Sequence, residues 1–194
     1  MHQTIARVLS DVRFHELLLA FDVDLSASVR AQGCPRCRAA LHSARYARKP
    51  RGVPAGLSEE YCQCLSLCCA REGCRRRATP PSMRFLGGKV YLGALVVLIS
   101  AMRCGATPAR IAQLHELIGV SRRTVQRWLQ WWSQIFTHSR FWRAAAGAFM
   151  PPVETAQLPA SLLSRFAGDA DRQLILLLRL LAPITGGARK VSAI

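Results

Sequence analysis

Eight cysteines are the residues of this chain whose type and spacing could do chemistry, and seven of them fall between Cys34 and Cys74. Three lie among arginines in LCCAREGCRRRATPPSMRF, residues 67 to 85. Positive charge lowers the pKa of a thiol and makes its thiolate reactive, so this segment could form a redox centre. The thiols could instead bind a metal while the cations face something anionic. The eighth cysteine, Cys104, follows an apolar run and is expected to be a small buried side chain.

Two short cysteine pairs have the spacing of metal-binding knuckles. CPRC supplies Cys34 and Cys37, and about thirty residues later CCAREGC supplies Cys69 and Cys74, with a glycine just before the last thiol. Two such pairs predict a tetrahedral site of four thiolates that holds one zinc ion. A catalytic zinc needs an open ligand position and a nearby general base, and His42 is the only histidine in this region. The pattern therefore favours a structural zinc.

The choice of the third ligand stays open at this point. Cys68 could replace Cys69, and Cys62 and Cys64 are close enough in sequence to compete. Alternate residues of an extended strand face opposite sides, so Cys68 and Cys69 would lie on different faces. We favour Cys69 because it adjoins the knuckle turn. The alternative is that these thiols only pack the strands of a small hairpin domain.

The region that must position the cysteines is strongly basic. From Arg30 to Arg84 the chain has twelve basic residues and three acidic ones. A metal can stabilise a small domain that has little core, and the surface is then left to carry charge. The alternative is a solvated basic face without a dedicated ligand. The cations expected to contact DNA phosphates here are Arg48, Lys49, Arg51, Arg75, Arg76 and Arg77.

The whole chain shares this charge. Its 194 residues include 27 Lys and Arg against 11 Asp and Glu, a net charge of +16, while 51% apolar residues suffice for a core. Such an excess indicates nucleic acid or an anionic membrane as partner. The longest apolar run, residues 90–102, is shorter than the roughly 20 residues of a spanning helix. No secretory signal is recognisable, so we expect a cytoplasmic protein with reduced thiols and no membrane contact.

A second constellation lies in TPARIAQLHELIGVSRRTVQRWLQWW, residues 107 to 132. Thr107 and Pro108 are typical of a helix start, Gly119 ends this helix, and Ser121 can cap the next one. Apolar residues recur on one face of each helix. They are Ile111, Leu114, Leu117 and Ile118 in the first helix and Val125, Trp128, Leu129 and Trp132 in the second. The pattern predicts a helix-turn-helix.

Polar side chains occupy the other face of the second helix. Arginine can bond guanine O6 and N7 together, and glutamine can bond adenine N6 and N7. The N-terminal turn of such a helix usually reaches the base edges. The alternative is a helical hairpin with a charged solvent face. His115 stands where such motifs usually carry a small residue, and a larger side chain there would push the helices apart. The residues expected to contact DNA are Arg122, Arg123, Gln126, Arg127 and Gln130.

Over about residues 30–145, the order of motifs in this chain resembles that of a known group of proteins. The motifs are the two cysteine pairs, CRRRATPPSMRFLG, an apolar helix and GVSRRTVQRWLQWW. This order is similar to that of the zinc-ribbon plus helix-turn-helix proteins associated with bacterial insertion sequences, and of the DNA-binding ends of their transposases. The resemblance implies binding to transposon-end or operator DNA. Transposases of the common type also hold two metal ions with a carboxylate triad. After the second helix this chain has only Glu154, Asp169 and Asp171, so the resemblance implies the DNA-binding part without a catalytic centre.

We therefore predict a mainly α protein with a small β zinc ribbon. Its expected function is sequence-specific binding of double-stranded DNA in a mobile element, with Zn as cofactor and no catalysis of its own. One alternative is a DNA-binding subunit or truncated form of a transposase whose catalytic residues come from a partner chain. The partner of this chain could also be a second copy of itself, in a homodimer. Another alternative is an RNA or single-strand binding scaffold, which would need exposed aromatic rings. The expected segments are a helical lead-in at 1–29, the zinc ribbon at 30–84, the helix-turn-helix domain at 85–145, C-terminal helices at 146–186 and a tail at 187–194.

Overall fold

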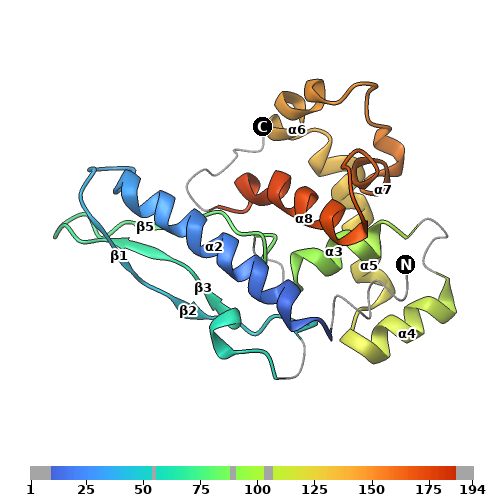
Figure 1. Cartoon of the computed structure of the whole chain (residues 1–194), viewed down its shortest axis with the longest axis horizontal. Coiled ribbons are helices and arrows are strands. Elements are labelled where there is room, and N and C mark those ends of the chain that lie inside the picture. The colour runs from blue at the N-terminus through green and yellow to red at the C-terminus, as the bar shows by residue number, and fades with distance from the viewer. Residues whose placement is uncertain (1–9, 54–55, 88–90, 103–106, 187–194) are drawn as a thin grey trace. The chain divides into compact units, whose positions relative to one another are not determined.

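The computed structural model describes residues 10–53, 56–87, 91–102 and 107–186 (Figure 1). These residues form many helices, one three-stranded sheet and one two-stranded sheet, which confirms the predicted fold class. The chain divides into two compact units. The cysteine unit comprises Ser10–Leu92 and the described residues from Leu178 onward, and the helical unit comprises Gly93–Leu177. Cys104 and the predicted tail lie outside the described residues.

The cysteine unit begins with helix α2 (Val12–Gln32). The Asp11 carboxylate caps it by accepting the backbone N–H groups of Arg13 and Phe14 at 3.0 and 3.4 Å. Gly33 ends it with a φ of 73°, a conformation that glycine adopts without strain. Buried residues recur every three or four positions and form one face. They are Phe14, His15, Leu18, Asp22 and Ser26. The helix continues past the predicted segment boundary at residue 29.

Five short strands and one 3-10 helix follow α2. The three-stranded antiparallel sheet has the order β1-β4-β5, and β2 pairs with β3 separately. The elements are β1 (Leu41–Ser43), β2 (Tyr46–Ala47), η1 (Glu59–Cys62), β3 (Gln63–Cys64), β4 (Leu67–Cys69) and β5 (Arg77–Ala78).

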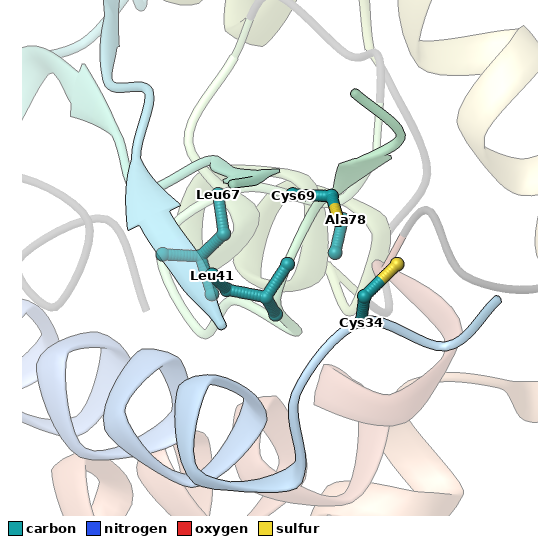
Figure 2. Packing of buried hydrophobic residues seen from close by; sticks show 5 residues of the cluster. All are labelled: Cys34, Leu41, Leu67, Cys69 and Ala78. Atoms are coloured by element: carbon teal, nitrogen blue, oxygen red, sulfur yellow. The ribbon is translucent and has the colours of Figure 1, made fainter. Parts of the chain in front are cut away.

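One face of the three-stranded sheet carries a small core. Figure 2 shows its buried members, which come from the loop after α2 and from all three strands; they are Cys34, Leu41, Leu67, Cys69 and Ala78. His42, Cys68 and Arg77 pair in register across the same strands. They face the other way, since side chains alternate along a strand. The core is therefore small, and two of its five members are cysteines.

A buried ion pair joins α2 to the segment after β5. The Arg84 Nε donates to the Asp22 carboxylate at 2.7 Å, and both side chains are almost fully buried. The same guanidinium donates to the carbonyl oxygens of Tyr61 and Gln63. Asp22 also accepts the Met83 backbone N–H at 2.6 Å. Arg84 is thus an internal cross-link of this unit, and its charge does not belong to the basic surface.

The helical unit contains most of the remaining helices. It begins with α3 (Gly93–Ser100), in which every residue is buried, as expected for the apolar run. The other elements are α4 (Pro108–Ile118), α5 (Arg122–Gln130), the π-helix η2 (Trp131–Phe136), α6 (Arg140–Ala145), η3 (Ala146–Ala148), η4 (Thr155–Gln157) and α7 (Ala160–Leu163). The boundary between the two units falls within α8 (Ala170–Leu181), and η5 (Ala182–Ile184) follows it. Each described helix is too short or too polar to cross a lipid bilayer.

Helices α4 and α5 begin and end where their sequence indicates. Thr107 caps α4 by accepting the Arg110 N–H at 3.4 Å, and Pro108 is its first residue. Gly119 ends α4 in the left-handed conformation, with a φ of 67°. Ser121 caps α5 by accepting the Thr124 N–H at 3.3 Å. These four predicted signals are confirmed.

The apolar faces predicted for α4 and α5 include residues that the structure does not bury. Leu117 is 54% exposed and Leu129 is 39% exposed, so their expected burial is wrong. On α4 only Leu114 and Ile118 are buried, four residues apart, and they form a narrow stripe. His115 is exposed, so its side chain does not separate the two helices. The buried residues of the turn, of α5 and of the π-helix are Val120, Val125, Trp128, Trp132 and Phe136.

Candidate metal centre and polar helix face

Four cysteine thiols converge in the cysteine unit. The sulfur atoms of Cys34, Cys37, Cys69 and Cys74 all lie within 4.8 Å of one another. Cys34 and Cys74 are 3.8 Å apart, and Cys37 and Cys69 are 3.5 Å apart. A regular tetrahedron with metal–sulfur distances of about 2.3 Å has sulfur–sulfur edges of about 3.8 Å. The four thiols chosen from the sequence are thus brought together with dimensions that can hold one metal ion.

The first pair is positioned by a closed turn at the end of α2. The Cys34 N–H donates to the Ala39 carbonyl and the Arg38 N–H donates to the Cys34 carbonyl, both at 2.8 Å. Gly33 leads into this turn, and a Cβ atom there would lie 2.7 Å from the Arg38 oxygen. Only glycine fits, both for space and for its positive φ. The glycine between helix and knuckle therefore sets the direction of the first two thiols.

The second pair is positioned by the end of β4 and the turn that follows. The Cys69 N–H donates to the Arg76 carbonyl at 2.9 Å, and the Cys74 N–H donates to the Arg71 carbonyl at 3.2 Å. The turn brings Cys74 back over Cys69. The sheet therefore positions one thiol of the pair and the turn positions the other.

The two pairs share a feature that the sequence analysis missed. Arg38 and Arg75, each directly after the second cysteine of its pair, have φ values of 59° and 40°. No other non-glycine residue in the described part of the chain has a positive φ. Side chains adopt this region at a cost, which explains why glycine is common in such turns. The sequence did contain a signal for this feature, because both arginines occupy the same position, directly after the second cysteine of a pair.

The local environment divides the thiols into two types. The backbone N–H groups of Arg36 and Cys37 hydrogen-bond the Cys34 sulfur and lower its pKa to about 6. Burial raises the pKa of Cys69 to about 12. Metals bind the thiolate form, so Cys34 is prepared for a metal whereas Cys69 must release a proton when a metal binds.

The other three cysteines of this region do not join the cluster. The thiol of Cys68, on the opposite face of β4, lies 3.4 Å from the Arg75 carbonyl oxygen. Cys64 pairs with Tyr46 across the two-stranded sheet, and a hydrogen bond between their side chains raises the pKa of Tyr46. Burial raises the pKa of Cys62. Among the described residues, no other group of three or more His, Cys, Asp or Glu side chains could hold a metal.

The predicted phosphate contacts of this unit fall into two groups. Arg75, Arg76, Arg77, Lys49 and Arg51 are exposed, and Arg48 is half-buried. The guanidinium of Arg48 instead lies 4.7 Å from the centre of the Phe85 ring and donates to the Gly87 carbonyl. Arg51 donates to the Tyr91 hydroxyl at 3.1 Å. Arg48 and Arg51 therefore also make contacts within the unit.

Helix α5 carries the second candidate site, in the helical unit. All five predicted DNA contacts are exposed on it, namely Arg122, Arg123, Gln126, Arg127 and Gln130. Val125 and Trp128 are buried on the other side of the same helix. The Gln130 amide donates to the Gln134 side chain at 3.0 Å, within this polar surface. The face offers guanidinium and amide groups to a partner.

Comparison with protein-family models, with curated proteins and with solved structures found no match to the chain. Two features of the described residues could carry the chemistry of the protein. One is the cluster of four thiols with exposed arginines beside it, in the cysteine unit, and the other is the polar face of α5, in the helical unit.

Proposed function

We propose that this protein binds double-stranded DNA at a specific sequence, through α5 and the arginines beside the thiol cluster, and that the cluster holds one structural zinc ion. The observation that carries the proposal is the face of α5, where three arginines and two glutamines are exposed opposite a buried apolar face. Arginine and glutamine are the side chains whose donors and acceptors match guanine and adenine edges in the major groove.

The zinc assignment rests on the donor set. Four thiolates close a tetrahedral site and leave no position for a substrate or a water molecule. Thiolates select zinc and similar ions over magnesium and calcium, which prefer oxygen ligands. The sheet core beneath has only five buried members, so a metal would supply much of the folding free energy. In the cytoplasm, where we expect this protein, the thiols stay reduced and available to the metal.

The DNA assignment rests on the helix pair. A three-residue turn joins α4 to α5, and the polar face begins at the first residue of α5. This arrangement supports a helix-turn-helix in which Arg122, Arg123 and Gln126 reach base edges. Trp128, Trp132 and Trp142 are buried and Trp131 is half-buried, so these rings offer little surface for stacking on single strands. The helical unit thus fits duplex DNA better than single-stranded RNA or DNA.

The exposed arginines of the second cysteine pair would anchor the phosphate backbone. Arg75, Arg76 and Arg77 follow Cys74 directly and are exposed. The net charge of +16 would add a long-range attraction to DNA. The resemblance to insertion-sequence proteins suggests transposon ends or operators as targets, with this chain acting alone, as a homodimer or beside a catalytic transposase chain.

A gel shift at several salt concentrations tests the proposal. We expect duplex DNA to bind better than single-stranded DNA or RNA of the same length. If six to ten phosphates are contacted, the affinity should fall by about a thousandfold or more between about 50 and 200 mM salt. Weak salt dependence, or a preference for single strands, would contradict duplex binding. Selection from a random duplex library would then give the preferred sequence.

A further inference from the structure

A pocket of about 290 Å³ lies in the cysteine unit beside the two-stranded sheet. Its lining includes Tyr46, Arg48, Leu65, Pro80, Pro81 and Phe85. Ligand pockets in proteins usually measure about 300 to 1,000 Å³, so this one has room for one small group rather than for a folded peptide.

Four polar residues of the pocket lining, Asp22, Ser82, Arg84 and Thr185, are engaged with one another. Asp22 accepts from Ser82 Oγ at 2.6 Å and from Arg84 at 2.7 Å. Thr185 Oγ1 accepts the Ser82 backbone N–H at 2.7 Å. These groups therefore already have partners within the protein, and the recognition of a ligand must come from the aromatic, proline and cationic side chains of the lining.

The walls have the chemistry that planar heteroaromatic rings require. Tyr46 lines the pocket and is 43% exposed. Arg48 lies over Phe85 at 4.7 Å, so its guanidinium is held at the same pocket. Exposed aromatic rings and adjacent guanidinium groups are the means by which proteins bind unstacked bases.

We propose that this pocket binds the base of one nucleotide, with the base ring against Tyr46 and the phosphate of the nucleotide near Arg48. The inference rests on the proposed function, which would supply the ligand as an unstacked base of the bound DNA. A free nucleotide offers the same chemistry.

The test compares two duplexes of the same sequence, one fully paired and one with a single unpaired base, by fluorescence anisotropy. The wild-type protein should bind the second duplex more tightly, by roughly 5-fold to 100-fold, the range that base stacking on an aromatic ring gives. Tyr46→Ala should abolish this preference and leave binding to the paired duplex unchanged. Tyr46→Phe keeps the ring and should keep the preference.

Lys49→Ala is the matched control, because it removes a neighbouring charge without altering the pocket walls. It should weaken both duplexes equally. Equal affinity of the wild-type protein for the two duplexes would overturn the proposal if a nucleoside monophosphate also fails to bind saturably. A preference that survives in Tyr46→Ala would overturn it as well.

Titration with the nucleoside monophosphate separates this inference from the proposed function. Saturable binding by the wild-type protein and not by Tyr46→Ala, without any duplex binding, would support the base pocket and refute DNA binding. Duplex binding without a base preference and without nucleotide binding would refute only the pocket.

Discussion

The thiol cluster and the face of α5 differ in how their residues relate to one another. The four thiols point inward and meet within 4.8 Å, although they come from segments more than thirty residues apart in the sequence. The five polar side chains of α5 point outward and do not converge. Side chains that converge on one point define the size and chemistry of their ligand by their own geometry. Side chains that point outward do not, and only a bound partner shows what they recognise. The same chain therefore contains one site that its structure specifies and one that only binding can specify.

The two regions also obtain their stability differently. The sheet core of the cysteine unit has five buried members, two of which are thiols of the cluster. Outside this sheet core, the cysteine unit also buries Leu18, Tyr61 and Met83, and the helical unit buries Leu95, Trp132 and Phe136. Apolar burial provides about 25 cal/mol per Å² removed from water, so the helical unit and the part of the cysteine unit outside the sheet core have a source of stability besides the metal. We expect metal removal and core mutations to damage different units.

Loss of the metal should produce the largest effect. In Cys37→Ser we expect the zinc to be lost and residues 33–84 to lose protection from hydrogen exchange. Structural zinc in small domains contributes on the order of 10 kcal/mol of apparent folding free energy. The helices from α3 to α7 should stay protected. Metal analysis of the purified full chain and hydrogen-exchange mass spectrometry measure both results.

Cys68 and Cys69 provide a matched pair of variants for this prediction. They are neighbours on β4, but only the Cys69 sulfur belongs to the cluster. Cys69→Ser should therefore lose the metal, and Cys68→Ser should keep it. The reverse result would mean that the wrong thiol of the pair was assigned to the site.

Trp132→Ala should produce the next largest effect, in the other unit. Trp132 is 1% exposed and packs edge-on against Trp131 and Phe136, with ring centres 4.8 and 5.0 Å apart. Truncating such a ring costs about 3 to 5 kcal/mol because a cavity remains. Hydrogen exchange should show destabilised α5 and α6 helices while the zinc content stays unchanged. Ile135→Ala, at a position 59% exposed, should change the stability little. Metal loss in Trp132→Ala would show that the two units do not fold separately.

Features that depend on neighbouring residues in the sequence were predicted well. The caps at Thr107 and Ser121 and the glycine at 119 follow local rules of helix termination, and all three are confirmed. The pairing of Cys34 and Cys37 with Cys69 and Cys74 was also readable, because two knuckles must meet to complete four ligands. In both cases short spacing in the sequence limits the geometry strongly.

Features that depend on distant partners were not readable. Arg84 was counted with the basic surface, yet it is buried against Asp22, which lies 62 positions earlier. Leu117 has the spacing of a buried residue and is exposed, because burial is set by what packs against the helix. The periodicity of apolar residues predicts which face of a helix is buried, but it does not predict how many residues of that face the neighbouring elements cover.

The smallest expected effects separate base reading from phosphate anchoring. Arg123 and Gln126 lie on the exposed face of α5, three residues apart, where they can reach adjacent base edges. Removing a bidentate contact to a base costs about 1 to 3 kcal/mol. Arg123→Ala and Gln126→Ala should therefore lose this amount on the preferred sequence and much less on random DNA. Binding isotherms on the two DNAs measure the difference.

Arg76→Ala should behave differently, because Arg76 belongs to the metal region and contacts no base in the proposed complex. Its carbonyl accepts the Cys69 N–H, so the sheet fixes its backbone while its side chain is exposed. A phosphate contact carries no sequence information, so the variant should weaken binding to both DNAs equally and reduce the salt slope by about one. Arg143→Ala, which removes an exposed charge from α6, controls for net charge and should leave the slope nearly unchanged. If Arg76→Ala instead lost affinity only for the preferred sequence, the metal region would be the one that reads bases and α5 would be the anchor.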